Sequence, residues 1–266
     1  MKVTKYTVII LSLLFFGCSN FQKALKTDEV LKKSELAATL YEQGKYRKAS
    51  QLYAQLKETY RGKPQAERIV FFYANSLLES KNHILAAYEF ETFVKAFPKS
   101  QKADEAYFLM AYAHYLTSPT FSLDQTETQE ALDKLQEFIN RYPESERMEN
   151  GNSMVKELRE KKEQKGFEIA KQYNTIRDYK ASITALDNFI ADNPGTSFRE
   201  SALFVQFSAT ATLAINSVYY KKEQRLKDAK SKFENFSQLY PDSGHMKKAT
   251  KIMNDIEQEI RTFTSN

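Results

Sequence analysis

Histidine is the side chain that most often binds metals or transfers protons near neutral pH, and this sequence contains three histidines. His83, His114 and His245 are widely separated, and none has a metal-ligand spacing such as H-E-x-x-H. His114 stands among alanines and tyrosines, as expected of a histidine that packs on a helix or faces a groove. The sequence also lacks a G-x-S-x-G elbow, a glycine-rich phosphate loop and a Cys/His pair. We therefore expect no bound metal and no nucleophilic active site.

Acidic side chains are numerous, and they include Glu89 with Glu91 and Asp133 with Glu137. Two catalytic carboxylates need no fixed separation along a chain, so the sequence leaves a glycosidase-type pair open. These acids nevertheless lie on the polar faces of predicted helices, interleaved with lysines. Solvation and ion pairs between residues i and i+4 account for such a pattern. We expect that the protein is not an enzyme and uses no catalytic cofactor.

The start of the chain differs from the rest. Lys2 and Lys5 precede an apolar run from Val8 to Phe16. This run is too short to cross a bilayer, which takes roughly 20 apolar residues. We interpret residues 1–17 as a secretory signal peptide.

Cys18 follows this segment directly and is the only cysteine in the chain. The sequence Phe15-Phe16-Gly17-Cys18 resembles a bacterial lipobox, whose cysteine is lipidated and becomes the new N-terminus; Phe15 replaces the usual leucine. The alternative is a buried core cysteine, but an exported protein with one unpaired thiol needs an explanation. A covalent lipid on Cys18 supplies it, and such a lipid anchors the protein stably because each buried methylene adds about 0.8 kcal/mol.

Ser19 and Asn20 follow the cysteine, without the acidic residue that retains some lipoproteins at the inner membrane. By resemblance to that sorting pattern, we expect a lipid-anchored protein at the outer membrane that faces the periplasm. The formal net charge is +5, and removing Lys2 and Lys5 with the signal lowers it to +3. Lysines alternate with acids, so we expect no binding to nucleic acid.

The full sequence has the composition of a helical protein, with 7 Gly, 6 Pro and 35 Tyr and Phe residues for a core. A short segment with proline, suited to end a helix and called a stop below, recurs four times. The four stops are Phe97-Pro98-Lys99-Ser100, Tyr142-Pro143-Glu144-Ser145, Asn193-Pro194-Gly195-Thr196 and Tyr240-Pro241-Asp242-Ser243. Proline ends one helix, and the Ser or Thr two residues later is suited to cap the next. Upstream of each stop, a small residue is followed by large apolar residues at i+4 and i+7, which places one stripe on a helix face.

These features resemble the tetratricopeptide repeat, and they predict an all-α fold: an α-solenoid of about five helical hairpins with a C-terminal closing helix. We expect a lipidated linker over residues 18–29 and a repeat domain over residues 30–266. The expected repeats cover about 30–62, 64–99, 102–145, 163–196 and 199–243, and the closing helix covers 246–263. Residues 117–128 are expected to form an inserted loop.

The stretches Phe93-Val94-Lys95-Ala96-Phe97-Pro98 and Ala111-Tyr112-Ala113-His114-Tyr115, with five uneven repeats and a lipobox, resemble the BamD family. Those proteins are outer-membrane lipoproteins of the β-barrel assembly machinery. The resemblance implies two kinds of partner. The C-terminal repeats, from Tyr173 to Lys248, would dock on the periplasmic domains of the barrel-shaped insertase, and the N-terminal repeats would receive unfolded outer-membrane proteins.

Stacked hairpins form a concave groove that accepts an extended or helical peptide. By the repeat register, the groove of the first three hairpins includes Tyr41, Arg68, Asn75, Glu79, Tyr112 and Tyr115. Tyrosine offers a large contact area with a polar tip, which suits an aromatic-rich peptide. The alternative is that about half of these side chains pack against neighbouring helices.

Two other scaffold functions remain open. One is a tetratricopeptide lipoprotein of another envelope complex, acting in cell-wall synthesis, division or polysaccharide export. The other is a lipoprotein that assembles with itself. The later stops fall 45, 51 and 47 residues apart rather than at the regular 34-residue period, and this unevenness favours the BamD interpretation.

Overall fold

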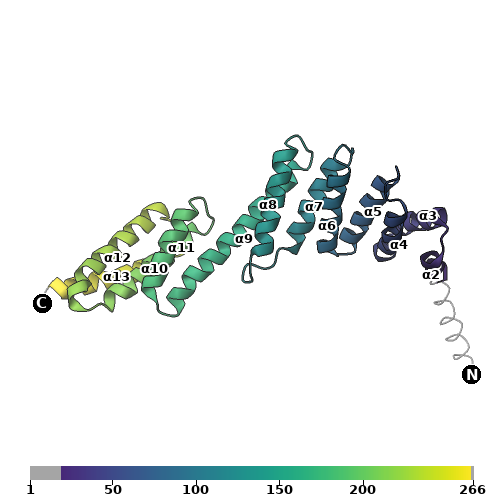
Figure 1. The fold of residues 1–266 in the computed structure, drawn as a ribbon. Coiled ribbons are helices and arrows are strands. Elements are labelled where there is room, and N and C mark those ends of the chain that lie inside the picture. The colour runs from purple at the N-terminus through teal and green to yellow at the C-terminus, as the bar shows by residue number, and fades with distance from the viewer. Residues whose placement is uncertain (1–18, 265–266) are drawn as a thin grey trace, which may run out of the picture. The chain divides into compact units, whose positions relative to one another are not determined.

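The computed structural model describes residues 19–264, so the predicted signal peptide and Cys18 lie outside the described residues. These residues form helices joined by turns and loops, and they contain no β-strand. The chain is divided into two compact units (Figure 1). The first comprises residues up to 119 together with 125–156, and the second comprises residues 120–124 together with 157–266.

The first unit is a series of antiparallel helical hairpins preceded by one short helix. Its helices are α2 (Ser19–Lys26), α3 (Val30–Glu42), α4 (Tyr46–Thr59), α5 (Ala66–Glu79), α6 (His83–Ala96), α7 (Ala103–Thr117), α8 (Thr126–Arg141) and the beginning of α9 (Met148–Thr175). Each helix from α3 to α7 packs against the next one along the chain. The segment expected to be a linker contains α2, which packs on α3 and α4 because Phe21 and Ala24 are buried in the core of the first hairpin.

The second unit continues the same pattern. It contains the remainder of α9, α10 (Tyr179–Asp192), α11 (Arg199–Ile215), α12 (Tyr219–Leu239) and α13 (Met246–Thr264). Helix α9 begins 15 residues before the expected repeat at 163, because residues 148–162 contain no proline and place Val155 and Leu158 in the core. Helix α13 packs on both α11 and α12. The predicted all-α fold of five hairpins with a closing helix is confirmed.

The small-to-large stripes form the cores of both units. The predicted small residues Ala49, Ala86, Ala131, Ser182 and Ala229 all have no exposed surface. The hydroxyl of Ser182 donates a hydrogen bond to the carbonyl of Ala170, 2.9 Å away, so this buried polar group is satisfied. Small side chains at these crossings let the paired helices approach closely, and the large ones fill the space beside them.

The predicted stops connect successive hairpins. The hydroxyl oxygens of Ser100, Ser145, Thr196 and Ser243 each accept a backbone N–H from the second residue after them. The N-cap residues of α7 and α11 are Lys102 and Phe198, without a side-chain cap, so Ser100 and Thr196 stabilise the turn before the helix and are not its N-caps as predicted. Three of these hydroxyls also donate to an acid in the first turn of the preceding hairpin: Ser100 to Glu67 at 2.6 Å, Ser145 to Asp104 at 2.8 Å and Ser243 to Glu200 at 2.5 Å. Each serine thus joins the start of one hairpin to the start of the next.

Three hairpin turns contain a residue in the left-handed backbone region. Gly44 has φ of 70°, and Lys81 and Arg177 occupy the equivalent turns with φ of 66° and 68°. Glycine adopts this conformation without cost, whereas other residues pay about 1–2 kcal/mol. Lys81 after α5 and Arg177 after α9 are therefore exposed cations whose backbone has a conformation that is unfavourable for residues other than glycine.

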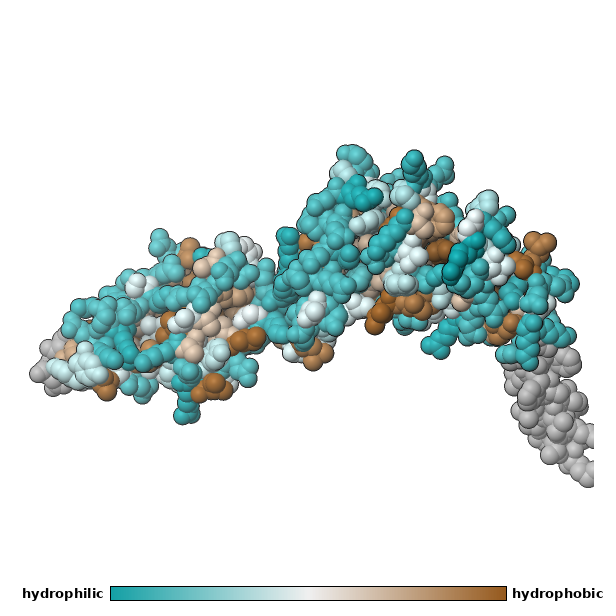
Figure 2. Space-filling model, viewed as in Figure 1, coloured by the Kyte–Doolittle hydropathy of each residue, from teal (hydrophilic) through white to brown (hydrophobic). Residues whose placement is uncertain are grey.

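The surface is mostly polar. In the view of Figure 2, hydrophilic residues cover most of the face, and hydrophobic residues are visible only in small groups. Over residues 19–264, no helix combines the length and apolar character needed to cross a membrane.

Candidate peptide-binding surface

The residues predicted for the groove all lie on the first helices of the three N-terminal hairpins. They are Tyr41 on α3, Arg68, Asn75 and Glu79 on α5, and Tyr112 and Tyr115 on α7. The structure places Tyr41 and Arg68 in one aromatic group and Tyr112 and Tyr115 in another. One group surrounds Phe72 between the first two hairpins, and the other is a row of rings along α7.

The first group is built around Phe72 of α5. Tyr41 meets Phe72 edge-on with ring centroids 5.0 Å apart, and it meets Tyr46 of α4 at 5.3 Å. Tyr53 of α4 stacks on Phe72 at 6.1 Å, and the guanidinium of Arg68 lies 5.7 Å from the centre of the Phe72 ring. Such aromatic pairs contribute about 0.5–1.5 kcal/mol each beyond the area that they bury. The group is therefore part of the packing between two hairpins as well as a surface feature.

Burial raises the pKa of two phenols in this group, Tyr53 and Tyr41. It raises the pKa of Tyr53 to about 12, against a smaller lowering by the nearby positive charge of Arg68. The pKa of Tyr41 is also raised, first by burial and then by the proximity of Tyr46 and Glu79. Tyr41 is partly exposed, so its neutral hydroxyl can donate a hydrogen bond to a backbone carbonyl of a bound peptide, whereas Tyr53 is only 3% exposed and serves the packing.

Glu79 and Asn75, two predicted groove residues on α5, differ in how much of their surface is exposed. Glu79, the last residue of α5, is exposed. Asn75 is only 9% exposed, and its Nδ2 donates to the carbonyl of Phe71 at 3.1 Å. The packing alternative therefore describes Asn75 better than a role in direct peptide contact.

The second group is a row of stacked rings on α7. Phe108 and Tyr112 are nearly parallel, with centroids 6.2 Å apart and an interplanar angle of 3°. Tyr112 and Tyr115 continue the row at 6.1 Å and 16°. Residues separated by four and then three positions share one helix face, which explains the alignment. Phe108 is buried, whereas both tyrosines are partly exposed, so the row rises from the core to the surface.

Sequence reasoning missed Tyr46, Tyr53, Phe72 and Phe108 as members of these groups. Phe71, Phe72 and Tyr73 are adjacent, and the structure buries Phe71 while leaving the other two partly exposed. In an unbroken aromatic run, helical periodicity alone does not reveal which ring faces the groove. The only sequence signal was the local density of aromatic residues.

The histidines occupy separate structural positions. His114 lies with Nδ1 3.7 Å from Oε1 of Glu130, and burial lowers its pKa. The ring of His245 stacks on Phe204 with centroids 4.4 Å apart. His83 begins α6, and its Nδ1 is buried without a hydrogen-bond partner among the described residues. Within residues 19–264, no three His, Cys, Asp or Glu side chains are grouped in a way that could hold a metal ion.

The candidate carboxylates are engaged in ion pairs or hydrogen bonds. Glu91 pairs with Lys95 at 3.0 Å, as predicted for an i,i+4 pair on a polar face. Glu89 departs from that expectation, because it is buried and both its oxygens accept hydrogen bonds from Lys57 of the preceding hairpin. The Glu89 carboxylate is therefore buried and paired across the hairpin boundary, and it is not solvated as predicted.

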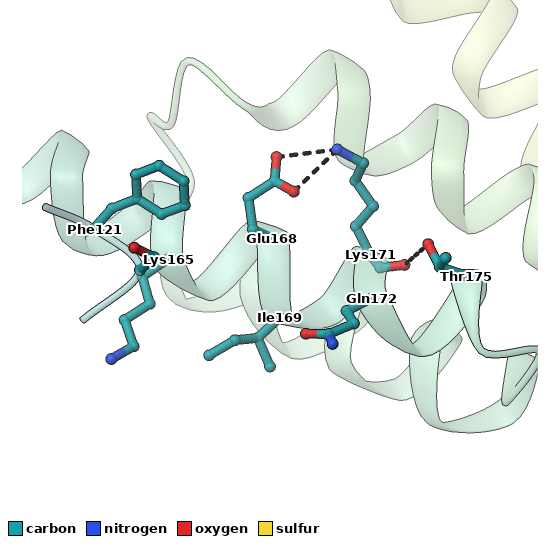
Figure 3. Close-up of a pocket in the computed structure, with 8 residues that line it drawn as sticks. Phe121, Lys165, Glu168, Ile169, Lys171, Gln172 and Thr175 are labelled. Atoms are coloured by element: carbon teal, nitrogen blue, oxygen red, sulfur yellow. Dashed lines mark hydrogen bonds and ion pairs between the residues drawn. The ribbon is translucent and has the colours of Figure 1, made fainter. Parts of the chain in front are cut away.

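The second unit has a shallow hollow of about 470 Å³ on α9, shown in Figure 3. Phe121 and Ser122 of the loop after α7 line one side, and Lys165 holds this loop by donating to the carbonyl of Leu123 at 2.7 Å. On the helix side, Lys171 pairs with Glu168 at 3.0 Å (Figure 3). Ile169 is 47% exposed in this hollow.

More exposed apolar residues lie in the region predicted to dock on the insertase. Ile176 at the α9–α10 turn is 65% exposed, and Tyr219 and Tyr220 at the start of α12 are 69% and 79% exposed. Exposed aromatic residues of this size are typical of interaction surfaces.

This chain is similar to a known protein family and to individual known proteins. A family model described as outer membrane lipoprotein, YfiO, matches residues 32–225 and 161–262. The outer membrane protein assembly factor BamD of Helicobacter pylori is 27% identical over 137 residues, which cover 48% of this chain and 60% of that protein. The chain thus spans less than two thirds of this curated relative. A crystal structure of MamA protein matches 80% of this chain and 92% of its own at 14% identity, with a TM-score of 0.33.

The predicted resemblance to BamD is confirmed by the family model and by this relative. The matched residues run across both units and include almost every helix from α3 to α13. The chain belongs to the YfiO family of outer membrane lipoproteins.

Proposed function

We propose that this protein is a non-catalytic scaffold that helps assemble β-barrel proteins in the outer membrane. It is held there by a lipid on Cys18 and faces the periplasm. The observation that carries the proposal is the family match over residues 32–225 and 161–262, together with a relative named as an assembly factor. The lipobox-like sequence before Cys18 supports the anchor.

The first unit receives unfolded outer-membrane proteins in this proposal. Transmembrane β-strands carry aromatic girdles, so their unfolded chains present aromatic side chains. The partly exposed rings of the Phe72 group and of the α7 row are available for stacking, and Tyr41 keeps its hydroxyl proton at neutral pH. This chemistry binds a substrate without altering it.

The second unit docks on the periplasmic domains of the insertase in this proposal. Support comes from the exposed apolar residues between Tyr173 and Lys248, above all Ile176, Tyr219 and Tyr220. Aromatic residues are enriched at protein–protein interfaces. The rival is a scaffold with the same fold in cell-wall synthesis, division or polysaccharide export, and the named relative makes it the weaker candidate.

Mass spectrometry of proteins that co-purify with the tagged protein tests the proposal. The protein is extracted in detergent at its native expression level. We expect a large β-barrel protein with repeated periplasmic domains in near-equal amount. Recovery of wall synthases, division proteins or export components in its place would assign the scaffold to the rival class.

Matched variants locate the docking surface within the same experiment. Ile176→Glu and Tyr220→Glu each introduce a charge on an exposed apolar position of the second unit, and both should lower the recovery of the barrel protein. Leu31→Glu makes the same kind of change at a position of the first unit that is 74% exposed. It should leave recovery unchanged.

A further inference from the structure

Four cations gather at the end of the first two hairpins that carries the turns between paired helices, and all but the partly buried Lys48 are exposed. Lys45, Arg47 and Lys48 of the first hairpin and Lys81 of the second line one open hollow of about 580 Å³, whose other lining residues are Gly44, Tyr46, Glu79 and Ser80. Arg47 and Lys81 also line a neighbouring hollow. We call these four cations the basic edge.

The basic edge has little compensating charge. Lys45 donates to the amide oxygen of Gln43, and Lys48 lies 5.4 Å from the centre of the Phe21 ring. None of the four cations forms an ion pair with a carboxylate of residues 19–264. The acids at this end are Glu79, which lines the hollow, and the exposed Glu42 at the end of α3. The edge is therefore net positive and available to an anionic partner.

The direction of α2 brings the start of the described chain to the same end. Near its beginning, Phe21 contacts Lys48 in the first turn of α4. Near its end, the carbonyl of Leu25 accepts a hydrogen bond from Gln55, two turns further along α4. The two helices therefore run in the same direction. Ser19, which directly follows Cys18 in the sequence, lies at the end of the hairpin that carries the basic edge.

An exposed apolar residue adjoins these cations. Ile84, in the first turn of α6 and three residues after Lys81, is 78% exposed. Lys81 itself holds a left-handed conformation with φ of 66°. Cations next to an exposed apolar side chain are the composition that binds at the interface of an anionic membrane.

We propose that the basic edge lies against the anionic headgroups of the membrane leaflet that holds the Cys18 lipid. This inference rests on the lipidation included in the proposed function. The lipid attaches the protein to the membrane, and the basic edge sets the orientation of the first unit relative to the bilayer. Because α2 is packed on the first hairpin through Phe21 and Ala24, the anchor and the edge face the bilayer together. The contact would hold the first unit with its turns toward the membrane.

Fluorescence quenching in vesicles tests the orientation directly, because the chain contains no tryptophan. Ile84→Trp places a probe at the basic edge. Leu31→Trp is the control, since Leu31 is 74% exposed and lies at the opposite end of the first hairpin. The full-length lipidated protein, verified by mass, is reconstituted in phosphatidylethanolamine vesicles that contain phosphatidylglycerol and brominated acyl chains. We expect the probe at position 84 to be quenched about twofold or more relative to the probe at position 31.

Charge variants test the electrostatic part. Lys45→Gln, Arg47→Gln, Lys48→Gln and Lys81→Gln, combined in the Ile84→Trp protein, should remove the excess quenching, since each cation near an anionic surface favours contact about fivefold. Lys63→Gln with Lys99→Gln removes charge near the opposite end of the hairpins and should leave the quenching unchanged. High salt or phosphatidylcholine vesicles should lower it.

Equal quenching at positions 84 and 31 in lipidated, vesicle-bound protein would overturn the inference. Binding of an acidic polypeptide to the basic edge in place of the vesicle would also overturn it. If the barrel protein still co-purifies in that case, only the membrane contact fails. A protein without lipid on Cys18 that recovers no barrel protein would count against both proposals.

Discussion

The ammonium group of Lys57 on α4 lies 2.6 Å from Oε2 and 2.7 Å from Oε1 of Glu89 on α6. The Glu89 side chain is only 4% exposed, and that of Lys57 is 24% exposed. This ion pair links the second helices of the first two hairpins across 32 residues of sequence. The ammonium group also lies 5.5 Å from the centre of the Tyr73 ring, so Lys57 contacts both helices of the second hairpin.

Removing one member of this pair should destabilise the protein strongly. Lys57→Met leaves a buried carboxylate without its partner, which costs about 3–5 kcal/mol. The double variant Lys57→Met with Glu89→Leu should recover most of this loss, because no charge then stays buried. Urea unfolding followed by circular dichroism at neutral pH measures the free energy of unfolding.

The exposed pair of Glu91 and Lys95 provides the control for this prediction. Its side chains are 37% and 72% exposed. Lys95→Met should cost less than about 1 kcal/mol, because water screens a surface pair. Equal losses for Lys57→Met and Lys95→Met would contradict the buried character of the first pair.

The buried phenol of Tyr53 should make stability fall in alkaline solution. Its pKa is raised to about 12 by burial, above the value of about 10 in an unfolded chain. The unfolded state therefore loses this proton first, and the contribution of Tyr53 is present below pH 10 and lost as pH rises toward 12. The slope reaches about 1.4 kcal/mol per pH unit between these values. Urea unfolding of wild type and Tyr53→Phe from pH 9 upward should show a shallower decline for the variant; parallel declines would argue against a buried phenol.

The row of rings on α7 should contribute to peptide affinity. Tyr112→Ala with Tyr115→Ala should weaken the binding of an aromatic-rich peptide about tenfold, since each stacked ring is worth about 0.5–1.5 kcal/mol. Fluorescence anisotropy with a labelled peptide from an outer-membrane protein measures the dissociation constant. Tyr88→Ala removes a tyrosine that is 60% exposed on α6, outside the row, and should have no effect. A similar loss for both variants would show that the row has no special role.

Cys18→Ala should abolish lipidation and move the protein out of the outer-membrane fraction. Intact mass of the wild-type protein should show the added acyl chains, and fractionation of the envelope should show the loss for the variant. The variant should leave the membrane because the acyl chains supply the membrane affinity, at about 0.8 kcal/mol per buried methylene. An unchanged outer-membrane fraction for Cys18→Ala would contradict the anchor.

Local patterns in the sequence were sufficient to predict the helices and hairpins. The small-to-large spacing of Ala86, Phe90 and Phe93 and the stop at Pro98 each act within one or two turns of helix. Such signals depend on neighbours a few residues apart, so they can be read without knowing the fold. The same reasoning placed the candidate groove residues on the first helices of three hairpins, and it included Asn75, which the structure buries.

The sequence by itself determined an all-helical repeat protein with a single cysteine suited to a lipid anchor, because periodicity and motif are local properties. Only the tertiary structure decided which charges are buried and which residues share a surface. The pairing of Lys57 with Glu89, the hydrogen bond from Ser145 to Asp104 and the alignment of α2 with α4 all join residues about 30 or more positions apart. Contacts of that kind depend on how hairpins stack, and no local pattern encodes the stacking.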